Sequence, residues 1–340
     1  MGNNGRRTQI DGLRGIATIL MVMGHCGILN LDGISNAIFF AISGFLFINP
    51  FKDDYELKYR KVGEIFRFYK NRALRILPTY YVVLLAVFLI TGFGMIPREH
   101  FIRILYFGEA YLHLWYMYDL VRILLIVPVV MFLYQSAAKK TGFLRNDLVC
   151  MAFWLVSAGI IRLVIIHFDL YNLRIYQFMI GIAAAYLFRF IRKQEIIYNL
   201  IRKYSIIGNA LIFYLYAFII LSSDSILSLL VPSMKTKCIG WMYFFTTSLI
   251  MSLLLILIVL YEDGFWGKVT GSKPFALIGR LSLQMYLIHY FLLPDTDYPS
   301  KYIVFIIVFT VSLCLSWLLD VMVTKITRII EGKVLEKKNG

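Results

Sequence analysis

The sequence is poor in charge. Only 16% of its 340 residues are charged, 60% are hydrophobic, and the mean hydropathy is +0.73. Soluble domains carry about 25% charged and ~45–50% apolar residues. A chain this apolar cannot cover a water-exposed surface with polar groups, and disordered chains are far more polar still. The composition therefore excludes both a soluble globular protein and a disordered one.

Acidic residues and cysteines are also scarce. The chain has 20 Asp and Glu against 35 Lys and Arg, so its net charge is +15. In a membrane protein such an excess is typical of basic loops at an anionic cytoplasmic leaflet, so we expect membrane lipids as partners and no nucleic acid. The four cysteines, Cys26, Cys150, Cys238 and Cys314, are far apart in the sequence. We expect buried thiols, with no disulfide framework and no metal site.

Long apolar segments recur along the whole chain. Each is close to the ~20 residues that cross a bilayer, and they lie near 13–31, 33–51, 76–96, 113–134, 147–168, 173–191, 206–223, 238–261, 276–293 and 302–322. We predict an all-α polytopic membrane protein with about ten transmembrane helices. It would form a single integral-membrane domain over 1–340, with short tails at 1–12 and 323–340. Residues 97–112 are amphipathic and predict a helix at the interface or a re-entrant segment.

The distribution of basic residues predicts the orientation. With both termini cytoplasmic, 25 of the 35 Lys and Arg fall in inner segments and five in outer loops. This is the asymmetry of the positive-inside rule. A cleaved signal peptide at the N-terminus is the alternative, because two arginines precede an apolar run and small residues. That run contains Arg14 and His25, which a disposable signal does not need.

The first predicted span carries three ionisable residues. Asp11 precedes Arg14 by three residues, one helical turn, so the two can pair. His25 follows Arg14 by eleven residues, which on an α-helix is the same face about 16 Å further along. Ionisable groups within a span are costly and usually functional. A satisfied buried histidine with an interfacial arginine is the structural alternative.

Two further motifs lie in the second span and at the start of the third. Ser43-Gly44 lies in an apolar helix, where it can be a small-residue helix contact. Arg72 and Arg75 are one helical turn apart at the inner end of the third span. Two guanidinium groups there are suited to phosphates, and a topological anchor is the alternative.

Polar residues also mark two later spans. His113, Trp115 and Tyr116 open the fourth span, where aromatic residues are usually interfacial. In the ninth span, Tyr286 and His289 share one helical stripe. A polar stripe of this kind lines a cavity or contacts another helix.

Taken together, these motifs closely resemble the signature of the membrane-bound acyltransferase family 3. They are Asp11-Gly-Leu-Arg14-Gly followed by His25, Phe-Phe-x-x-Ser-Gly-Phe at 39–45, Arg-x-x-Arg-Ile-Leu-Pro at 72–78, Leu-Trp-Tyr at 114–116 and Tyr-Leu-Ile-His at 286–289. The resemblance covers essentially the whole chain. Leu283 departs from it, because many relatives have an aromatic residue there.

The resemblance implies a stand-alone O-acetyltransferase of the plasma or inner membrane. Its co-substrate would be cytosolic acetyl-CoA, with no permanently bound cofactor, and its acceptor a cell-surface polysaccharide or a lipid-linked precursor. The implied catalytic residues are His25, Arg14 and Asp11, and the implied donor-binding residues are Arg72 and Arg75. The residues expected at a cavity or acceptor site are Ser43, Trp115, Tyr286 and His289.

Alternatives remain at two levels. Transfer can be direct, or it can pass through an acyl-histidine or an acyl-serine at Ser43. A transporter or flippase for a glycan lipid would also use ten spans with internal charges. Against it, the Arg14–His25 pattern has no counterpart in the second half of the chain, so the sequence shows no inverted repeat. No pattern specifies the acceptor sugar or an oligomeric state.

Overall fold

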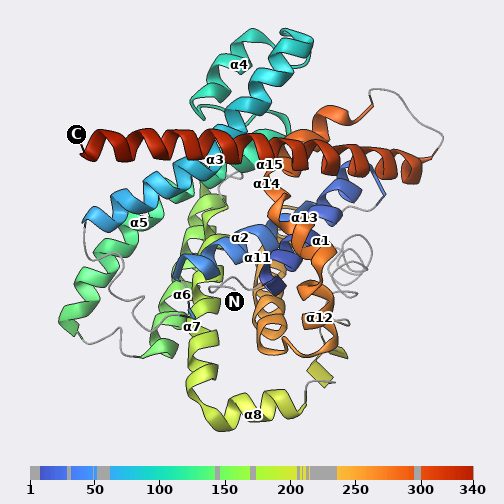
Figure 1. Cartoon of the computed structure of the whole chain (residues 1–340). Helices are drawn as coiled ribbons and strands as arrows, with labels where there is room; N and C mark the ends of the chain where they lie inside the picture. The colour runs from blue at the N-terminus through green and yellow to red at the C-terminus, as the bar shows by residue number, and fades with distance from the viewer. Residues whose placement is uncertain are drawn as a thin grey trace. The chain divides into compact units, whose positions relative to one another are not determined.

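The computed structural model describes residues 8–28, 32–48, 50–51, 62–141, 146–168, 174–204, 207–208, 210–211, 214, 236–294 and 300–339. These residues form helices and no strands (Figure 1). The helices are α1 (Thr8–His25), α2 (Asp32–Ile48), α3 (Val62–Thr91), α4 (Arg98–Leu105), η2 (Leu112–Leu114), α5 (Trp115–Thr141), α6 (Asp147–His167), α7 (Ile175–Lys193), α8 (Glu195–Lys203), α11 (Thr236–Leu260), α12 (Phe265–Gly271), α13 (Lys273–Arg280), α14 (Ser282–Ile288), η4 (His289–Leu292) and α15 (Lys301–Asn339). The predicted all-α class is confirmed for this part of the chain.

The chain forms two compact units. Unit 1 comprises Met1–Glu56 and Ala138–Arg280, and unit 2 comprises Leu57–Ala137 and Leu281–Gly340. In unit 1, α7 packs against α2, α6 and α11, while α1 packs against α2, α12 and α13. In unit 2, α15 packs against α3, α14 and η4. Each unit therefore combines helices that are distant in the sequence.

Small residues allow close helix packing in unit 1. A Cβ added to Gly44 of α2 would overlap the carbonyl oxygen of Phe178 in α7. A Cβ added to Gly181 of α7 would overlap the carbonyl oxygen of Ala41 in α2. The two helices thus meet through reciprocal glycines, which is how membrane helices bring their backbones together. This confirms the small-residue interpretation of the Ser43-Gly44 step.

Among the described residues, five helices are long and apolar enough to cross a membrane: Val62–Thr91, Leu112–Ser136, Asp147–Ile165, Ile175–Lys193 and Lys301–Lys325. The number rises to seven if each of two bent pairs is one span, Thr247–Leu260 with Phe265–Gly271 and Lys273–Arg280 with Ser282–Leu292. Each of these seven overlaps one of the ten predicted spans, with bounds that differ by up to about fourteen residues. The fold is therefore that of a multi-pass membrane protein.

The count of ten spans and the cytoplasmic termini stay predictions. The helix α1 has 18 residues and includes charged Asp11 and Arg14, which lower its hydropathy. The helix α2 has 17 residues, shorter than a typical span. Most of the predicted span near 206–223 lies outside the described residues.

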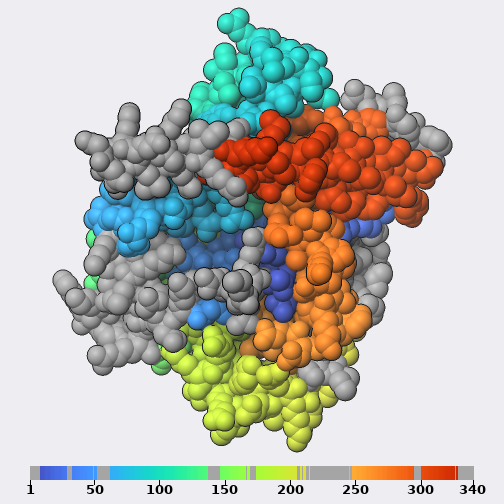
Figure 2. Space-filling model, viewed as in Figure 1, coloured from blue at the N-terminus to red at the C-terminus, as the bar shows by residue number. Residues whose placement is uncertain are grey.

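Burial separates inner helices from outer ones. The most apolar window of α7 is 78% buried, whereas that of α15 is only 22% buried. Exposed side chains of α15 include Ile303, Ile306 and Trp317, and Figure 2 shows atoms of the first part of this helix in red at the surface. Such a large apolar surface fits lipid rather than water. Cys314 of α15 is exposed, so the expectation that it is a buried thiol is wrong, whereas Cys26 is buried as predicted.

Candidate functional site

The polar residues of the first predicted span lie on one continuous helix, α1. The Arg14 guanidinium donates to Asp11 Oδ1 at 3.4 Å, which confirms the predicted pair. Asp11 is buried and Arg14 is half-buried, so the pair is largely shielded from solvent. Thr18 Oγ1 donates to the Arg14 carbonyl at 2.9 Å. His25 is the last residue of α1 and is half-buried.

Glycines beside this pair allow α1 to pack closely against α12 and α13 of unit 1. A Cβ added to Gly12 would overlap the carbonyl oxygen of Thr270, and a Cβ added to Gly15 would overlap that of Phe275. Reciprocally, a Cβ added to Gly279 of α13 would overlap the Asp11 carbonyl oxygen. The glycines of the Asp11–Gly15 motif therefore serve backbone contact, a role that the spacing of the motif did not reveal. The α1–α13 contact fixes the backbone that carries the Asp11–Arg14 pair.

Ser43 lies on α2, the neighbour of α1 in unit 1, and its side chain is half-buried. The next residue, Gly44, makes the close contact with α7 that was described above. A position next to such a contact has a fixed backbone. The structure thus assigns the packing to Gly44 and leaves the Ser43 hydroxyl as a candidate polar group.

The two candidate donor-binding arginines belong to α3 of unit 2. They are one turn apart, with Arg72 half-buried and Arg75 exposed. The Arg72 guanidinium carbon lies 5.3 Å from the centre of the Phe68 ring, a cation–π distance. The neighbouring Tyr69 hydroxyl donates to the Leu125 carbonyl of α5 at 2.6 Å. This turn of α3 is therefore anchored where it carries the arginines.

A second polar cluster in unit 2 is formed by Tyr286, His289 and His113. The Tyr286 hydroxyl donates to the backbone carbonyl of His113. The two imidazole rings are 5.7 Å apart, centre to centre, and His113 and His289 are 3% and 0% exposed. The polar stripe of α14 and η4 thus contacts the segment that leads into α5. Of the two predicted alternatives, a cavity lining or a contact with another helix, the structure shows the helix contact.

Hydrogen bonds fix the tautomers of both histidines when they are neutral. His289 Nδ1 is 3.0 Å from the Met285 carbonyl and 2.9 Å from the Tyr286 carbonyl. Because carbonyl oxygens only accept, Nδ1 carries the proton and Nε2 is the basic atom. His113 Nε2 is 3.4 Å from the Leu287 carbonyl, which assigns the proton to Nε2 by the same argument. Two oriented imidazoles in a buried site can exchange or hold a proton.

Aromatic rings surround this cluster. The His113 ring stacks on Tyr290 at 4.6 Å, with 16° between the ring planes. The Tyr116 ring lies 5.2 Å from that of Tyr286, and half-buried Trp115 lies next to Tyr116 at 6.2 Å. These rings restrict the movement of the histidines and exclude water from them.

The predicted site residues divide between the units. Unit 1 contains Asp11, Arg14, His25 and Ser43, and unit 2 contains Arg72, Arg75, Trp115, Tyr286 and His289. The sequence indicates His113 only as part of a helix start and not as a site residue. The signal that could have identified it is a histidine inside an apolar segment. Within the described part of the chain, no group of three or more His, Cys, Asp or Glu residues could hold a metal ion.

Comparison with known families gives one match. A family model described as an acyltransferase domain, that of acyltransferase family 3, matches residues 7–321. The match extends over most of both units and includes every predicted site residue. No curated protein and no solved structure matches the chain.

Proposed function

Because the chain belongs to acyltransferase family 3, we propose that it moves an acetyl group from cytosolic acetyl-CoA to a hydroxyl of a cell-surface polysaccharide or its lipid-linked precursor. The observation that carries this proposal is the family match from residue 7 to residue 321, across every candidate site motif. The apolar helices and basic loops favour action in the cell (plasma or inner) membrane.

In the proposed reaction, the acceptor hydroxyl oxygen attacks the thioester carbonyl carbon of acetyl-CoA. The C–O bond forms, the C–S bond breaks, and the CoA thiolate leaves and takes up a proton. His25 accepts the hydroxyl proton as general base, which typically contributes a factor of ~10²–10⁴. Asp11 orients Arg14 through the 3.4 Å pair. The alternative is a covalent route, in which the acetyl group is first transferred to a histidine or to the Ser43 hydroxyl with loss of CoA, and then from there to the acceptor hydroxyl.

Arg72 and Arg75 would bind the phosphates of the donor. Guanidinium groups form forked, charge-assisted hydrogen bonds with phosphate oxygens. The one-turn spacing on α3 and the partial exposure of both side chains leave them accessible to a polyanion. Trp115, Tyr286 and His289 would contribute to the acceptor site, where aromatic faces and hydrogen-bonding groups suit a sugar.

Incubating isolated membranes with acetyl-CoA labelled in the acetyl group tests the proposal. We expect label in the glycan fraction of cells that express the protein, and none when His25→Ala replaces it. His167→Ala is the matched control, because His167 also ends a helix of unit 1. Comparing the glycan from deletion and complemented cells by NMR identifies the acetylated hydroxyl. Unlabelled glycan, together with an unchanged spectrum, would contradict the proposal.

A further inference from the structure

Residues 106–112, here called the strap, connect α4 to η2, include Leu112 as the first residue of η2, and have an unusual backbone. Phe107 and Leu112 have φ angles of 55° and 47°, although neither is glycine. Left-handed conformations are unfavourable for side chains of this size and persist only where surrounding contacts impose them. The contacts that hold the strap therefore determine its path.

The beginning of the strap is held by an aromatic stack. The Phe107 ring lies on the Tyr80 ring of α3 at 4.7 Å, with 27° between the planes. The buried Tyr80 hydroxyl donates to the Ile104 carbonyl at the end of α4, at 2.8 Å. The Tyr81 hydroxyl donates to the next carbonyl, that of Leu105, at 2.9 Å. The junction of α4 with the strap is thereby fixed to α3.

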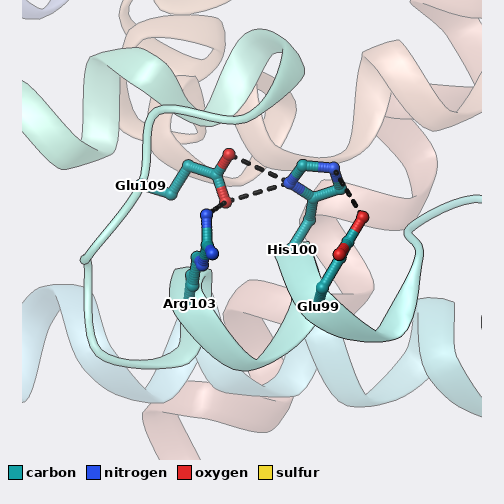
Figure 3. A network of polar contacts seen from close by, with 4 residues as sticks. All are labelled: Glu99, His100, Arg103 and Glu109. Atoms are coloured by element: carbon teal, nitrogen blue, oxygen red, sulfur yellow. Dashed lines mark hydrogen bonds and ion pairs between the residues drawn. The ribbon is translucent and has the colours of Figure 1, made fainter.

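The middle of the strap is held by ionisable side chains (Figure 3). His100 Nδ1 of α4 lies 2.9 and 3.0 Å from the two carboxylate oxygens of Glu109. Arg103 approaches the same carboxylate at 4.0 Å, and Glu99 lies 3.7 Å from the other ring nitrogen of His100. The His100 ring also stacks on Tyr111 at 4.3 Å. His100 thus holds the strap through both a carboxylate and a ring.

The strap ends at the buried cluster of His113, Tyr286 and His289. Leu112, the second left-handed residue, directly precedes His113. His113 offers its carbonyl to Tyr286, and its ring stacks on Tyr290. Any displacement of Tyr111 and Leu112 moves this carbonyl and this ring.

We propose that His100 and Glu109 are positioning residues for His113. Their contact fixes the strap, and the strap places the His113 carbonyl against Tyr286 and its imidazole beside His289. The inference rests on the proposed function, in which Tyr286 and His289 belong to the acceptor site. A small misplacement of such groups slows the chemical step without weakening donor binding.

A double-mutant cycle on Glu109→Ala and His100→Ala tests the proposal. The assay is transfer of label from acetyl-CoA to glycan in isolated membranes, normalised to protein abundance. We expect each single variant to lose about tenfold in kcat, with KM for acetyl-CoA unchanged. The double variant should lose no more than His100→Ala alone, because His100→Ala already removes the contact with Glu109 together with the Tyr111 stack. Glu109→Gln should restore part of the rate, since its amide oxygen still accepts from His100 Nδ1–H.

Glu99→Ala is the matched control, since Glu99 carries the same charge as Glu109 and neighbours His100 on α4, but it is 74% exposed and is not part of the strap. It should keep the wild-type rate. Full activity in Glu109→Ala would overturn the proposal, as would additive losses or a parallel rise in KM for acetyl-CoA. His289→Gln separates the two levels of the argument. If His289→Gln is active, the assignment of His289 to the acceptor site under the proposed function fails. If it is inactive while Glu109→Ala is active, only the positioning role fails.

Discussion

Replacing His25 is the most direct test of the proposed chemistry. A general base typically contributes a factor of ~10²–10⁴. At about 1.36 kcal/mol for each factor of ten, its loss raises the barrier by roughly 2.7–5.4 kcal/mol. We expect His25→Ala and His25→Gln to lose transfer by this factor. Glutamine should not rescue, because its amide keeps a hydrogen bond but takes no proton at neutral pH.

The structure separates this loss from a loss of folding. His25 ends α1 and is half-buried, so its removal opens no closed cavity. The predicted topology depends on loop charges, which neither variant changes. Both variants should therefore insert at normal abundance. The measurement is the initial rate of label transfer to glycan divided by the amount of protein in the membrane, with His167→Ala as the control.

The opposite pattern would refute the reasoning. If His25→Gln is well inserted and active, the imidazole of His25 is not the base. If His25→Ala then fails only because the protein is lost, His25 is a structural residue. The chemistry would move to His289, whose Nε2 is the basic atom when Nδ1 donates to carbonyls. His289→Gln, measured beside the His25 variants, would decide between the two.

Three further predictions follow from contacts in the two units. Arg72→Ala and Arg75→Ala should each raise KM for acetyl-CoA ten- to a hundredfold, the equivalent of ~1.5–3 kcal/mol for a charge-assisted contact. Lysine should rescue poorly because it cannot fork, and an unchanged KM in both would leave the arginines as topological anchors. Gly279→Ala should lower the free energy of unfolding by about 1–3 kcal/mol, because the new Cβ overlaps the Asp11 carbonyl. The measurement is Tm in detergent, and an unchanged Tm would show that α13 can move away. Tyr286→Phe should cost a similar ~1–3 kcal/mol by leaving the buried His113 carbonyl without its hydroxyl donor, and a wild-type Tm would show that another donor replaces it.

Local patterns in the sequence predicted the helices well. Apolar runs of span length predicted α3, α5, α6, α7 and α15, and three-residue spacing predicted the Asp11–Arg14 pair. These features depend on neighbours along the chain, which periodicity and composition describe. The amphipathic segment 97–112 likewise contains the helix α4. The helix is shorter than the segment because the strap follows it.

Features that depend on distant neighbours were not predictable. The reason for Gly12 appears only when α12 lies against α1, and the partner of Tyr286 is 173 residues away in the sequence. The contact of His100 with Glu109 needs a backbone turn that passes through the left-handed Phe107, a conformation that the residue type Phe argues against. In each case the missing information is a tertiary contact rather than a propensity.

The uninterrupted helix α1 also restricts how this part of the chain can vary in length. Arg14 and His25 are eleven residues apart on one helix. Deleting one residue between them would turn His25 by about 100° and shift it by about 1.5 Å, without removing any polar group. Inserting or deleting close to one whole helical turn would restore the direction in which His25 points but not its distance from Arg14. The relative placement of Arg14 and His25 therefore depends on the length of the segment between them, which substitution of an apolar side chain leaves unchanged.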